Sequence, residues 1–277
     1  SPMSDRNDIR LALPSKGRLA DDTLDLLAKA GLRVYKPNPR QFQATIPSLP
    51  NVTVLFQRAG DIAVSVHDGT VDFRITGWDM VSEQGGIGDN ILPLHRELGY
   101  GQCTLNVIVP EAWSDINHMD DLETLQEREV ENLRVATKFP RLTKAFFEDY
   151  GLEDVDYISA EGTLEIAPVI GHTDLIVDLV STGTTMRANH LKALQDGEIL
   201  SSQACLVAHR PSLQNRPEAL DVARQLLEFI VAHLRAKNNV AVFANMRGDS
   251  PQAIADNMQT QKVIGGLQGP TISPVMT

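Results

Sequence analysis

The stretch that most restricts the fold of this chain is residues 173–189, TDLIVDLVSTGTTMRAN. Its apolar run, residues 175–180, has the length of a buried strand and carries one acid, Asp178. The run ends in a small, hydroxyl-rich turn, Ser181-Thr182-Gly183-Thr184-Thr185, and the residues that follow can begin a helix. A strand, a tight turn and a helix N-terminus in this order predict an α/β protein, with unpaired N–H groups and hydroxyls directed to one point.

Two interpretations of this turn stay open on spacing alone. In the first, the turn is a phosphate cradle, and Asp178 binds the hydroxyls of a sugar whose phosphate the turn holds. In the second, it is an ordinary strand–helix connection in which Ser and Thr cap the helix. The turn lacks the lysine of a Walker loop, and no G-x-G-x-x-G follows a strand, which weakens nucleotide-triphosphatase and dinucleotide interpretations.

The same order of strand, polar turn and helix recurs near the start of the chain. Predicted strands cover residues 9–13, 52–57 and 71–76, and charged residues follow each of them. The carboxyl ends of parallel strands meet at one edge of a sheet, so these residues should cluster there. The residues in question are Lys16, Arg18, Arg58, Asp61 and Asp79.

The elements divide into two α/β lobes and a smaller third part. The first lobe is expected to comprise residues 1–104 and 193–214, and the second residues 105–192 with the hydroxyl-rich turn. Two such lobes joined by two crossings predict parallel or mixed sheets, a periplasmic-binding-protein-like architecture and a cleft between the lobes. Residues 217–277 begin with a long amphipathic helix, whose apolar face at Leu226–Leu234 is compatible with self-association. Residues 84–100 are expected to be irregular, and residues 111–131 exposed.

Composition excludes some classes of partner. The 277 residues carry a net charge of −11, which argues against non-specific nucleic-acid or membrane binding. Cys103 and Cys205 lie far apart in apolar contexts, and we expect buried free thiols rather than a disulfide or a metal site. A cytoplasmic location is expected, because the sequence contains no signal peptide and no apolar run of transmembrane length.

Several motifs, in order along the chain, resemble the ATP phosphoribosyltransferase family, the first enzyme of histidine biosynthesis. The longest begins at Glu165 (EIAPVIG) and continues to the hydroxyl-rich turn, and others are Lys16-Gly17-Arg18-Leu19 and Ile75-Thr76-Gly77-x-Asp79. The resemblance covers most of residues 9–210. Residues 217–277 resemble the beginning of the regulatory domain of the family's long form, which continues for another β-α-β stretch, so this α+β domain is expected to be incomplete. Arg74 departs from the family, where glycine is usual, and could add a cation near the cleft.

The resemblance implies a glycosyltransferase reaction. N1 of the ATP adenine attacks C1 of phosphoribosyl pyrophosphate, and pyrophosphate leaves with Mg²⁺. Asp178 would hold the ribose hydroxyls and oppose the positive charge of the transition state. Lys16, Arg18 and Arg58 would neutralise the phosphate oxygens. Asp61 and Asp79 could orient these cations or hold Mg²⁺ through water, and which acids bind the metal is left open.

The expected site therefore has three overlapping groups. The catalytic residues are Asp178, Arg18 and Glu165. The residues for phosphoribosyl pyrophosphate are Asp178, Ser181, Thr182, Gly183, Thr184 and Thr185. The residues for ATP and pyrophosphate are Lys16, Gly17, Arg18, Arg58, Asp61, Asp79 and Thr137.

Two other classes of protein compete with this enzyme. A solute-binding protein shares the two-lobed architecture, but the cations at residues 16–18 and Arg58 count against it. A non-catalytic regulatory paralogue should have lost the hydroxyl-rich turn, which this chain keeps. For the enzyme, the resemblance further implies a homo-oligomer, a dimer or hexamer, with histidine as a possible allosteric feedback inhibitor.

Overall fold

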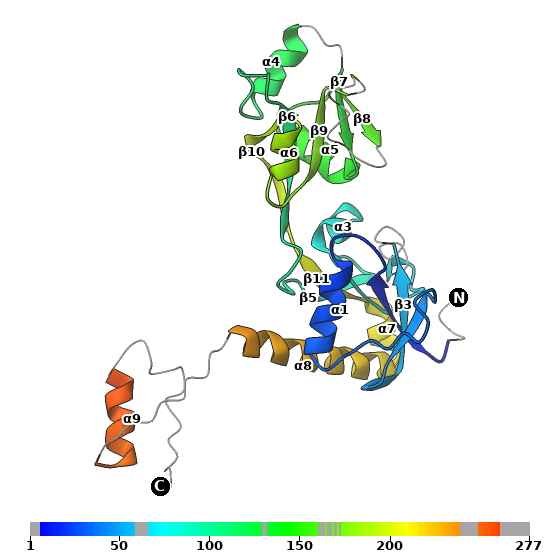
Figure 1. Ribbon diagram of the computed structural model, residues 1–277. Helices are drawn as coiled ribbons and strands as arrows, with labels where there is room; N and C mark the ends of the chain where they lie inside the picture. Colours follow the sequence, from blue (N-terminus) through cyan, green and yellow to red (C-terminus); the bar gives the residue numbers. More distant parts are fainter. Residues whose placement is uncertain are drawn as a thin grey trace. The chain divides into compact units, whose positions relative to one another are not determined.

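The computed structural model describes residues 6–58, 66–128, 132–159, 164, 168, 171, 173–238 and 249–260 (Figure 1). The chain divides into two compact units, Ser1–Arg235 and Ala236–Thr277. The first unit contains two mixed β-sheets with helices, which confirms the predicted α/β fold. In the second unit the described element is α9 (Pro251–Thr260), a predicted helix. Residues 239–248 and 261–277 of the expected α+β domain lie outside the described residues.

The first sheet has the strand order β2-β3-β1-β4-β11-β5. Its strands are β1 (Ile9–Pro14), β2 (Gln43–Ile46), β3 (Leu49–Gln57), β4 (Phe73–Gly77), β5 (Ile91–His95) and β11 (Ala204–His209). Strands β3, β1 and β4 run parallel, with Pro14 in register with Gln57, whereas β2, β11 and β5 are antiparallel to their neighbours. The carboxyl ends of three adjacent strands therefore meet at one edge.

The second sheet has the order β10-β6-β9-β7-β8. Its strands are β6 (Cys103–Pro110), β7 (Leu133–Thr137), β8 (Val155–Ser159), β9 (Leu175–Val180) and β10 (Leu191–Ser202). Strands β7, β8 and β9 are parallel, and β6 is antiparallel to both β9 and β10. The apolar run with Asp178 is thus the central strand β9, which is why it is nearly continuous in hydrophobic residues.

Two connections join the sheets: residues 96–102 lead from β5 to β6, and Gln203 leads from β10 to β11. Cys103 and Ser202 are in register, so the connections lie side by side (Figure 1). The expected boundary at residue 193 falls inside β10, which pairs with β6 as far as Ser202. Residues 193–202 therefore belong to the second sheet, and only β11 returns to the first.

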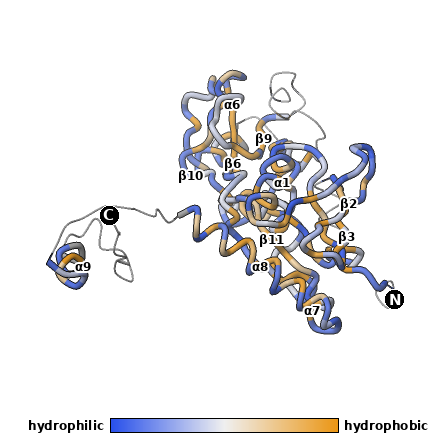
Figure 2. Tube along the Cα trace, turned by 60° about the horizontal axis from the view of Figure 1, so that its bottom comes forward, coloured by the Kyte–Doolittle hydropathy of each residue, from blue (hydrophilic) through white to orange (hydrophobic). Residues whose placement is uncertain are grey.

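The helices cover the sheets and close two hydrophobic cores. They are α1 (Ala20–Lys29), α3 (Trp78–Glu83), α4 (Asp121–Arg128), α5 (Pro140–Asp149), α6 (Thr184–Ala188), α7 (Arg210–Asn215) and α8 (Pro217–Asn238). Hydrophobic residues follow the central strands and hydrophilic residues the outer turns (Figure 2). Leu226 and Ile230 of α8 are fully buried in the first core, together with α1. Part of the apolar face of α8 expected to serve self-association is therefore covered within its own chain, whereas Phe229 on the same helix is exposed. The third domain expected from residue 217 begins with a helix that packs on the first lobe.

Other expectations about regular structure were wrong for local reasons. Residues 84–100 contain β5, a short edge strand that tolerates Pro93. Residues 111–131, for which only exposure was expected, are mostly exposed or half-exposed where described and contain α4, with Leu122 buried beneath its acidic surface. The alternation of β10 is interrupted by register shifts around Glu198, which hid this strand in the sequence.

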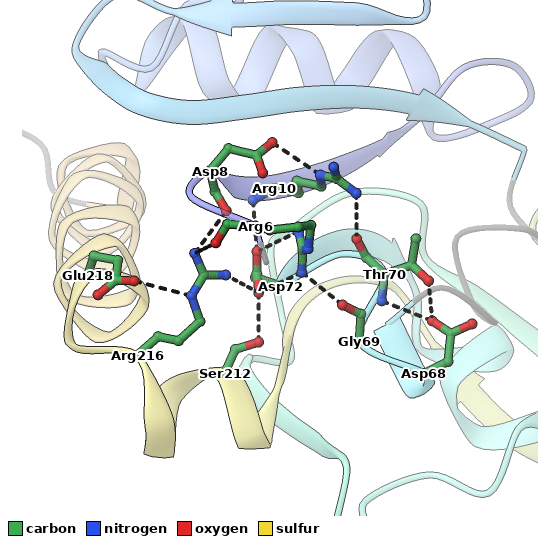
Figure 3. A network of polar contacts seen from close by, with 10 residues as sticks. All are labelled: Arg6, Asp8, Arg10, Asp68, Gly69, Thr70, Asp72, Ser212, Arg216 and Glu218. Atoms are coloured by element: carbon green, nitrogen blue, oxygen red, sulfur yellow. Dashed lines mark hydrogen bonds and ion pairs between the residues drawn. The ribbon is translucent and has the colours of Figure 1, made fainter. Parts of the chain in front are cut away.

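A buried polar network lies at the amino ends of β1 and β4 (Figure 3). The fully buried Asp72 carboxylate accepts hydrogen bonds from Ser212 Oγ at 2.6 Å and the Arg10 N–H at 2.9 Å. It also pairs with Arg6 and Arg216, each at 3.4 Å. We call Asp72, Arg6, Arg216 and Ser212 the Asp72 cluster. It ties the chain start, α7 and the residue before α8 to the sheet.

Candidate functional site

The hydroxyl-rich turn follows β9 directly, as predicted. Gly183 adopts a left-handed conformation with φ of 76°, which few other residues take without strain. The hydroxyls of Thr182 and Thr184 lie 3.0 Å apart, and the N–H of Thr184 points to Thr182 Oγ1 at 3.4 Å. The turn therefore presents backbone and hydroxyl groups on a short, glycine-dependent bend.

The turn opens onto a pocket of about 110 Å³. The six residues predicted to bind phosphoribosyl pyrophosphate all line it: Asp178, Ser181, Thr182, Gly183, Thr184 and Thr185. Ile108, Ile176, Met186 and Leu191 form its apolar wall. The volume far exceeds the roughly 10–15 Å³ that one water needs, so a multi-atom group fits. Polar groups at one side and a hydrophobic wall at the other suit a phosphorylated sugar.

The helix after the turn is shorter than the sequence suggested. α6 has five residues, so its dipole adds little, and the hydroxyls and N–H groups must provide most of the attraction for an anion. Arg187, in the last turn of α6, donates to the Thr182 carbonyl at 3.1 Å. A Cβ at Gly183 would lie 2.7 Å from Arg187 Nη1. Arg187 therefore braces the turn, and sequence analysis missed it because its place in the motif carried no signal.

At the carboxyl edge of the first sheet, Lys16 and Arg18 follow β1 and Arg58 follows β3. The N–H of Ser15 donates to the Gln57 carbonyl at 2.9 Å, which holds these two strand ends together. Gly17 has φ of 91°, so the Lys-Gly-Arg turn also depends on glycine. The predicted gathering of cations at this edge is present for the described residues, and Asp61 lies outside them.

Arg18 is the best fixed of these cations. Its Nη2 pairs with Asp79 Oδ1 at 3.1 Å, and its Nη1 donates to the Gly101 carbonyl at 2.6 Å. Asp79 is buried at the start of α3 and also accepts the Ser202 hydroxyl at 2.8 Å. We call Asp79, Arg18 and Ser202 the Asp79 cluster. This contact with Arg18 is compatible with one of the two roles expected for Asp79, that of orienting a cation.

Two glycines make room for Arg18. A Cβ at Gly77 would overlap the Asp79 carboxylate and lie 3.1 Å from Arg18 Nη2. A Cβ at Gly101 would overlap Leu19 and lie 3.0 Å from Arg18 Nη1. Sequence analysis recorded Gly77 only as part of a motif and missed Gly101 and Ser202, because close approach between distant segments leaves no local pattern.

Thr137 and Arg74 are buried. Thr137 is fully buried at the end of β7, and its hydroxyl accepts the Phe139 N–H at 3.0 Å, so it shapes the turn before α5. Arg74, which was expected to add a cation near the cleft, is fully buried in β4, and burial lowers the pKa of its guanidinium to about 10. Glu165 lies outside the described residues.

Both cysteines are buried and free, as predicted. Burial raises the pKa of the Cys103 thiol and raises that of Cys205 to about 12. Both thiols are therefore protonated near neutral pH and poor nucleophiles. In the part of the chain that the structure describes, no three His, Cys, Asp or Glu side chains gather as metal ligands, and no helix could cross a membrane.

Two mixed sheets and a hydroxyl-lined pocket at the end of a central strand define an α/β protein suited to a phosphorylated sugar. Residues 58–234 match the family model of ATP phosphoribosyltransferase. The chain belongs to the ATP phosphoribosyltransferase family, the glycosyltransferases that catalyse the first step of histidine biosynthesis. The expected family is thereby confirmed.

Known relatives agree with this assignment. The chain is 44% identical over 273 residues to ATP phosphoribosyltransferase 2, chloroplastic, of Arabidopsis thaliana, covering 98% of this chain and 66% of the relative. It is 38% identical to an ATP phosphoribosyltransferase of Bradyrhizobium diazoefficiens, covering 96% and 83%. It therefore spans about two thirds of the plant protein's length. An ATP phosphoribosyl transferase (HisG:HisZ) complex from Thermotoga maritima shares the fold, with a TM-score of 0.63 at 23% identity over 82% of this chain and 99% of that one.

Proposed function

We propose that this chain transfers the 5-phosphoribosyl group from phosphoribosyl pyrophosphate to N1 of ATP and releases pyrophosphate. The observation that carries the proposal is the pocket at the end of β9, where Asp178 and residues 181–185 come together. The 5′-phosphate does not react, so its binding in this pocket can position C1 for attack. Family membership supports the reaction class and counts against the solute-binding and regulatory alternatives.

Asp178 is proposed to act at the ribose. Its carboxylate accepts the Leu179 N–H at 2.8 Å, which orients it at the end of β9. From there it would bind ribose hydroxyls and stabilise the positive charge that develops as the bond to pyrophosphate breaks. Adenine N1 already carries a lone pair, so the attack needs no strong general base.

The carboxyl edge of the first sheet is proposed to bind the phosphate oxygens. Arg18 offers a planar fork that the Asp79 cluster holds in place, whereas Arg58 is an exposed guanidinium and Lys16 an exposed point charge. Glu165 and Asp61 keep their expected roles as part of the proposal. This arrangement requires both sheets to contribute to one substrate complex.

Mg²⁺ is proposed to enter with the diphosphate rather than to occupy a preformed cage. Mg²⁺ usually keeps several waters and takes phosphate oxygens, so it needs few protein ligands. Asp79 is committed to Arg18 and Ser202. The hydrated ion would contact Asp61, as expected, or Asp178, whose carboxylate lines the pocket. The ion would neutralise charge on the leaving pyrophosphate.

A direct assay tests the activity. The protein is mixed with ATP, phosphoribosyl pyrophosphate and Mg²⁺, and the absorbance of the ribosylated product is followed. Controls omit one substrate at a time. Product formation that needs both substrates is the expected result, and a folded protein that forms no product would contradict the proposal.

Substitutions in the pocket test its role. Thr185→Ala and Asp178→Asn should each lower kcat/KM for phosphoribosyl pyrophosphate by at least about tenfold, since each removes one charge-assisted contact. Thr45→Ala, an exposed threonine of β2, is the matched control and should leave the kinetics unchanged. If kcat/KM of both pocket variants stays within twofold of the parent value, this pocket is not the binding site for phosphoribosyl pyrophosphate.

We propose further that the chain is a cytoplasmic homo-oligomer, a dimer or hexamer, and that histidine inhibits it allosterically through residues beyond 236. The two free thiols suit a reducing compartment. Titrating histidine into the assay, with light scattering to measure mass, tests inhibition and oligomer together. Unchanged rates at millimolar histidine and a monomeric mass would contradict these proposals.

A further inference from the structure

Ser202 stands where the chain leaves the second sheet. It is the last residue of β10, is 5% exposed, and is in register with Cys103, the first residue of β6. Its hydroxyl donates to Asp79 Oδ1 at 2.8 Å and accepts the Asp79 N–H at 2.9 Å. A single side chain thus fixes both the carboxylate and the backbone of Asp79, 123 residues away in sequence.

Asp79 in turn fixes the guanidinium of Arg18, which also contacts the β5–β6 connection. Asp79 Oδ1 is shared by Ser202 and Arg18, and Arg18 Nη1 donates to the carbonyl of Gly101 in the β5–β6 connection. Neighbouring backbone bonds keep the two connections together: the N–H of Ala204 donates to the Tyr100 carbonyl at 2.9 Å, and that of Leu98 to the Ala204 carbonyl at 3.0 Å. Arg18 is therefore bonded directly to the β5–β6 connection and is linked through Asp79 to Ser202, the residue before the β10–β11 connection.

We propose that Ser202 is a positioning residue for Arg18, and that through Asp79 it holds the guanidinium in the orientation that binds the diphosphate. This inference rests on the proposed function only for the identity of the anion. It adds a residue of the second sheet's last strand to the anion-binding edge of the first sheet. If the two connections move, these hydrogen bonds would change the orientation of the Arg18 guanidinium directly.

The physical reason is the freedom of an arginine side chain. Arg18 is 38% exposed and has many rotamers, and fixing it only when the anion arrives would cost binding free energy. A carboxylate that is itself held on two sides gives the guanidinium one preferred position beforehand. Without the Ser202 hydroxyl, the shared oxygen of Asp79 loses one of its donors, and Asp79 can turn away from Arg18.

Pyrophosphate binding tests this without turnover. Calorimetric titration of the full chain with magnesium pyrophosphate is carried out on the parent, Ser202→Ala and Ser202→Thr, which keeps the hydroxyl. Ser201→Ala is the matched control, because Ser201 is the exposed neighbour on the same strand. We expect binding to weaken about five- to tenfold in Ser202→Ala, and to stay within about twofold in Ser202→Thr and Ser201→Ala. Thermal unfolding of each variant checks that it is folded.

A double-mutant cycle separates positioning from a general structural effect. In an Arg18→Lys background, whose ammonium lacks the fork, Ser202→Ala should weaken binding by less than about twofold further. An equal loss in both backgrounds, no loss in Ser202→Ala, or absence of pyrophosphate binding by the parent would overturn the inference. A parent that binds pyrophosphate but forms no product would instead contradict the proposed function, and the cycle would still decide the role of Ser202.

Discussion

The Asp72 cluster and the Asp79 cluster combine the same groups at opposite ends of β4. Each has a buried aspartate that accepts one serine hydroxyl and pairs with arginine. The two clusters differ in the solvent exposure of their arginine side chains. Both arginines of the Asp72 cluster have side chains 11% exposed, whereas that of Arg18 is 38% exposed.

This difference separates a structural network from the network that we propose to bind the diphosphate. In the Asp72 cluster the donors come from the chain start, β1, α7 and the residue before α8, and they surround the carboxylate (Figure 3). Charges enclosed on all sides hold elements together but leave no face for a ligand. Arg18 uses some of its five donors on Asp79 and Gly101 and keeps an exposed side toward solvent. Similar residue types therefore serve different purposes, and exposure distinguishes them.

The largest effect is expected from Asp72→Ala. The substitution removes the carboxylate that Arg6 and Arg216 share and leaves Arg216 with the exposed Glu218 as its carboxylate partner, so the free energy of unfolding should fall by about 3–5 kcal/mol. The kcat/KM of the molecules that remain folded should stay close to that of the parent. Urea unfolding measures the loss, with Asp68→Ala, an exposed aspartate nearby, as control. A loss below about 1 kcal/mol would show that the Asp72 cluster does not hold the fold.

Arg18→Ala should lower activity strongly and stability only slightly, the opposite of Asp72→Ala. The kcat/KM for phosphoribosyl pyrophosphate should fall about ten- to a hundredfold, because a bidentate contact to an anion is lost. The loss of stability should be smaller than for Asp72→Ala, because water already reaches the guanidinium and Ser202 still donates to Asp79. Steady-state kinetics and urea unfolding are measured on the same preparation, with exposed Arg33→Ala as control. Unchanged kinetics, or destabilisation as large as for Asp72→Ala, would erase the distinction between the clusters.

The parts of this chain that follow a local pattern were predictable from sequence. The strands at residues 9–13, 52–57 and 175–180 and the long helix that begins at residue 217 were expected close to their observed bounds, because apolar patterning is strong there. The hydroxyl-rich turn was recognised because its residues are consecutive. The short edge strand β5 and the bulged β10 escaped, since tertiary pairing rather than local propensity stabilises them.

The supports of the site were the least predictable part. Ser202 and Gly101 reach Arg18 only after the two connections come side by side, and no spacing in the sequence records that contact. For Arg74 the error runs the other way. The sequence suggested a cation near the cleft, and the side chain is fully buried. Burial of the apolar face of α8 likewise depends on where the helix packs.

The smallest predicted effect is a pH dependence confined to the edge of the Asp72 cluster. His209, at the end of β11, is 4% exposed, and its backbone N–H donates to the Asp72 backbone carbonyl at 2.8 Å. Burial lowers the pKa of its imidazole below the ordinary 6.5, although the Val66 carbonyl and the charges of Asp72 and Asp68 act in the other direction.

A lowered pKa in the folded state means that the unfolded state takes up its proton first as the pH falls. The contribution of His209 is therefore fully present above pH 6.5 and is lost as the pH drops toward the folded-state pKa. Urea midpoints between pH 7.5 and 5.5 should decrease less in His209→Gln than in the parent, whereas exposed His67→Gln should follow the parent. Equal decreases in the parent and His209→Gln would place the acid sensitivity elsewhere. A difference in this decrease between the parent and His209→Gln, with the affinity for pyrophosphate unchanged over the pH range, would show where acid acts. In that case acid weakens the buried Asp72 cluster but does not affect anion binding at the more exposed Asp79 cluster.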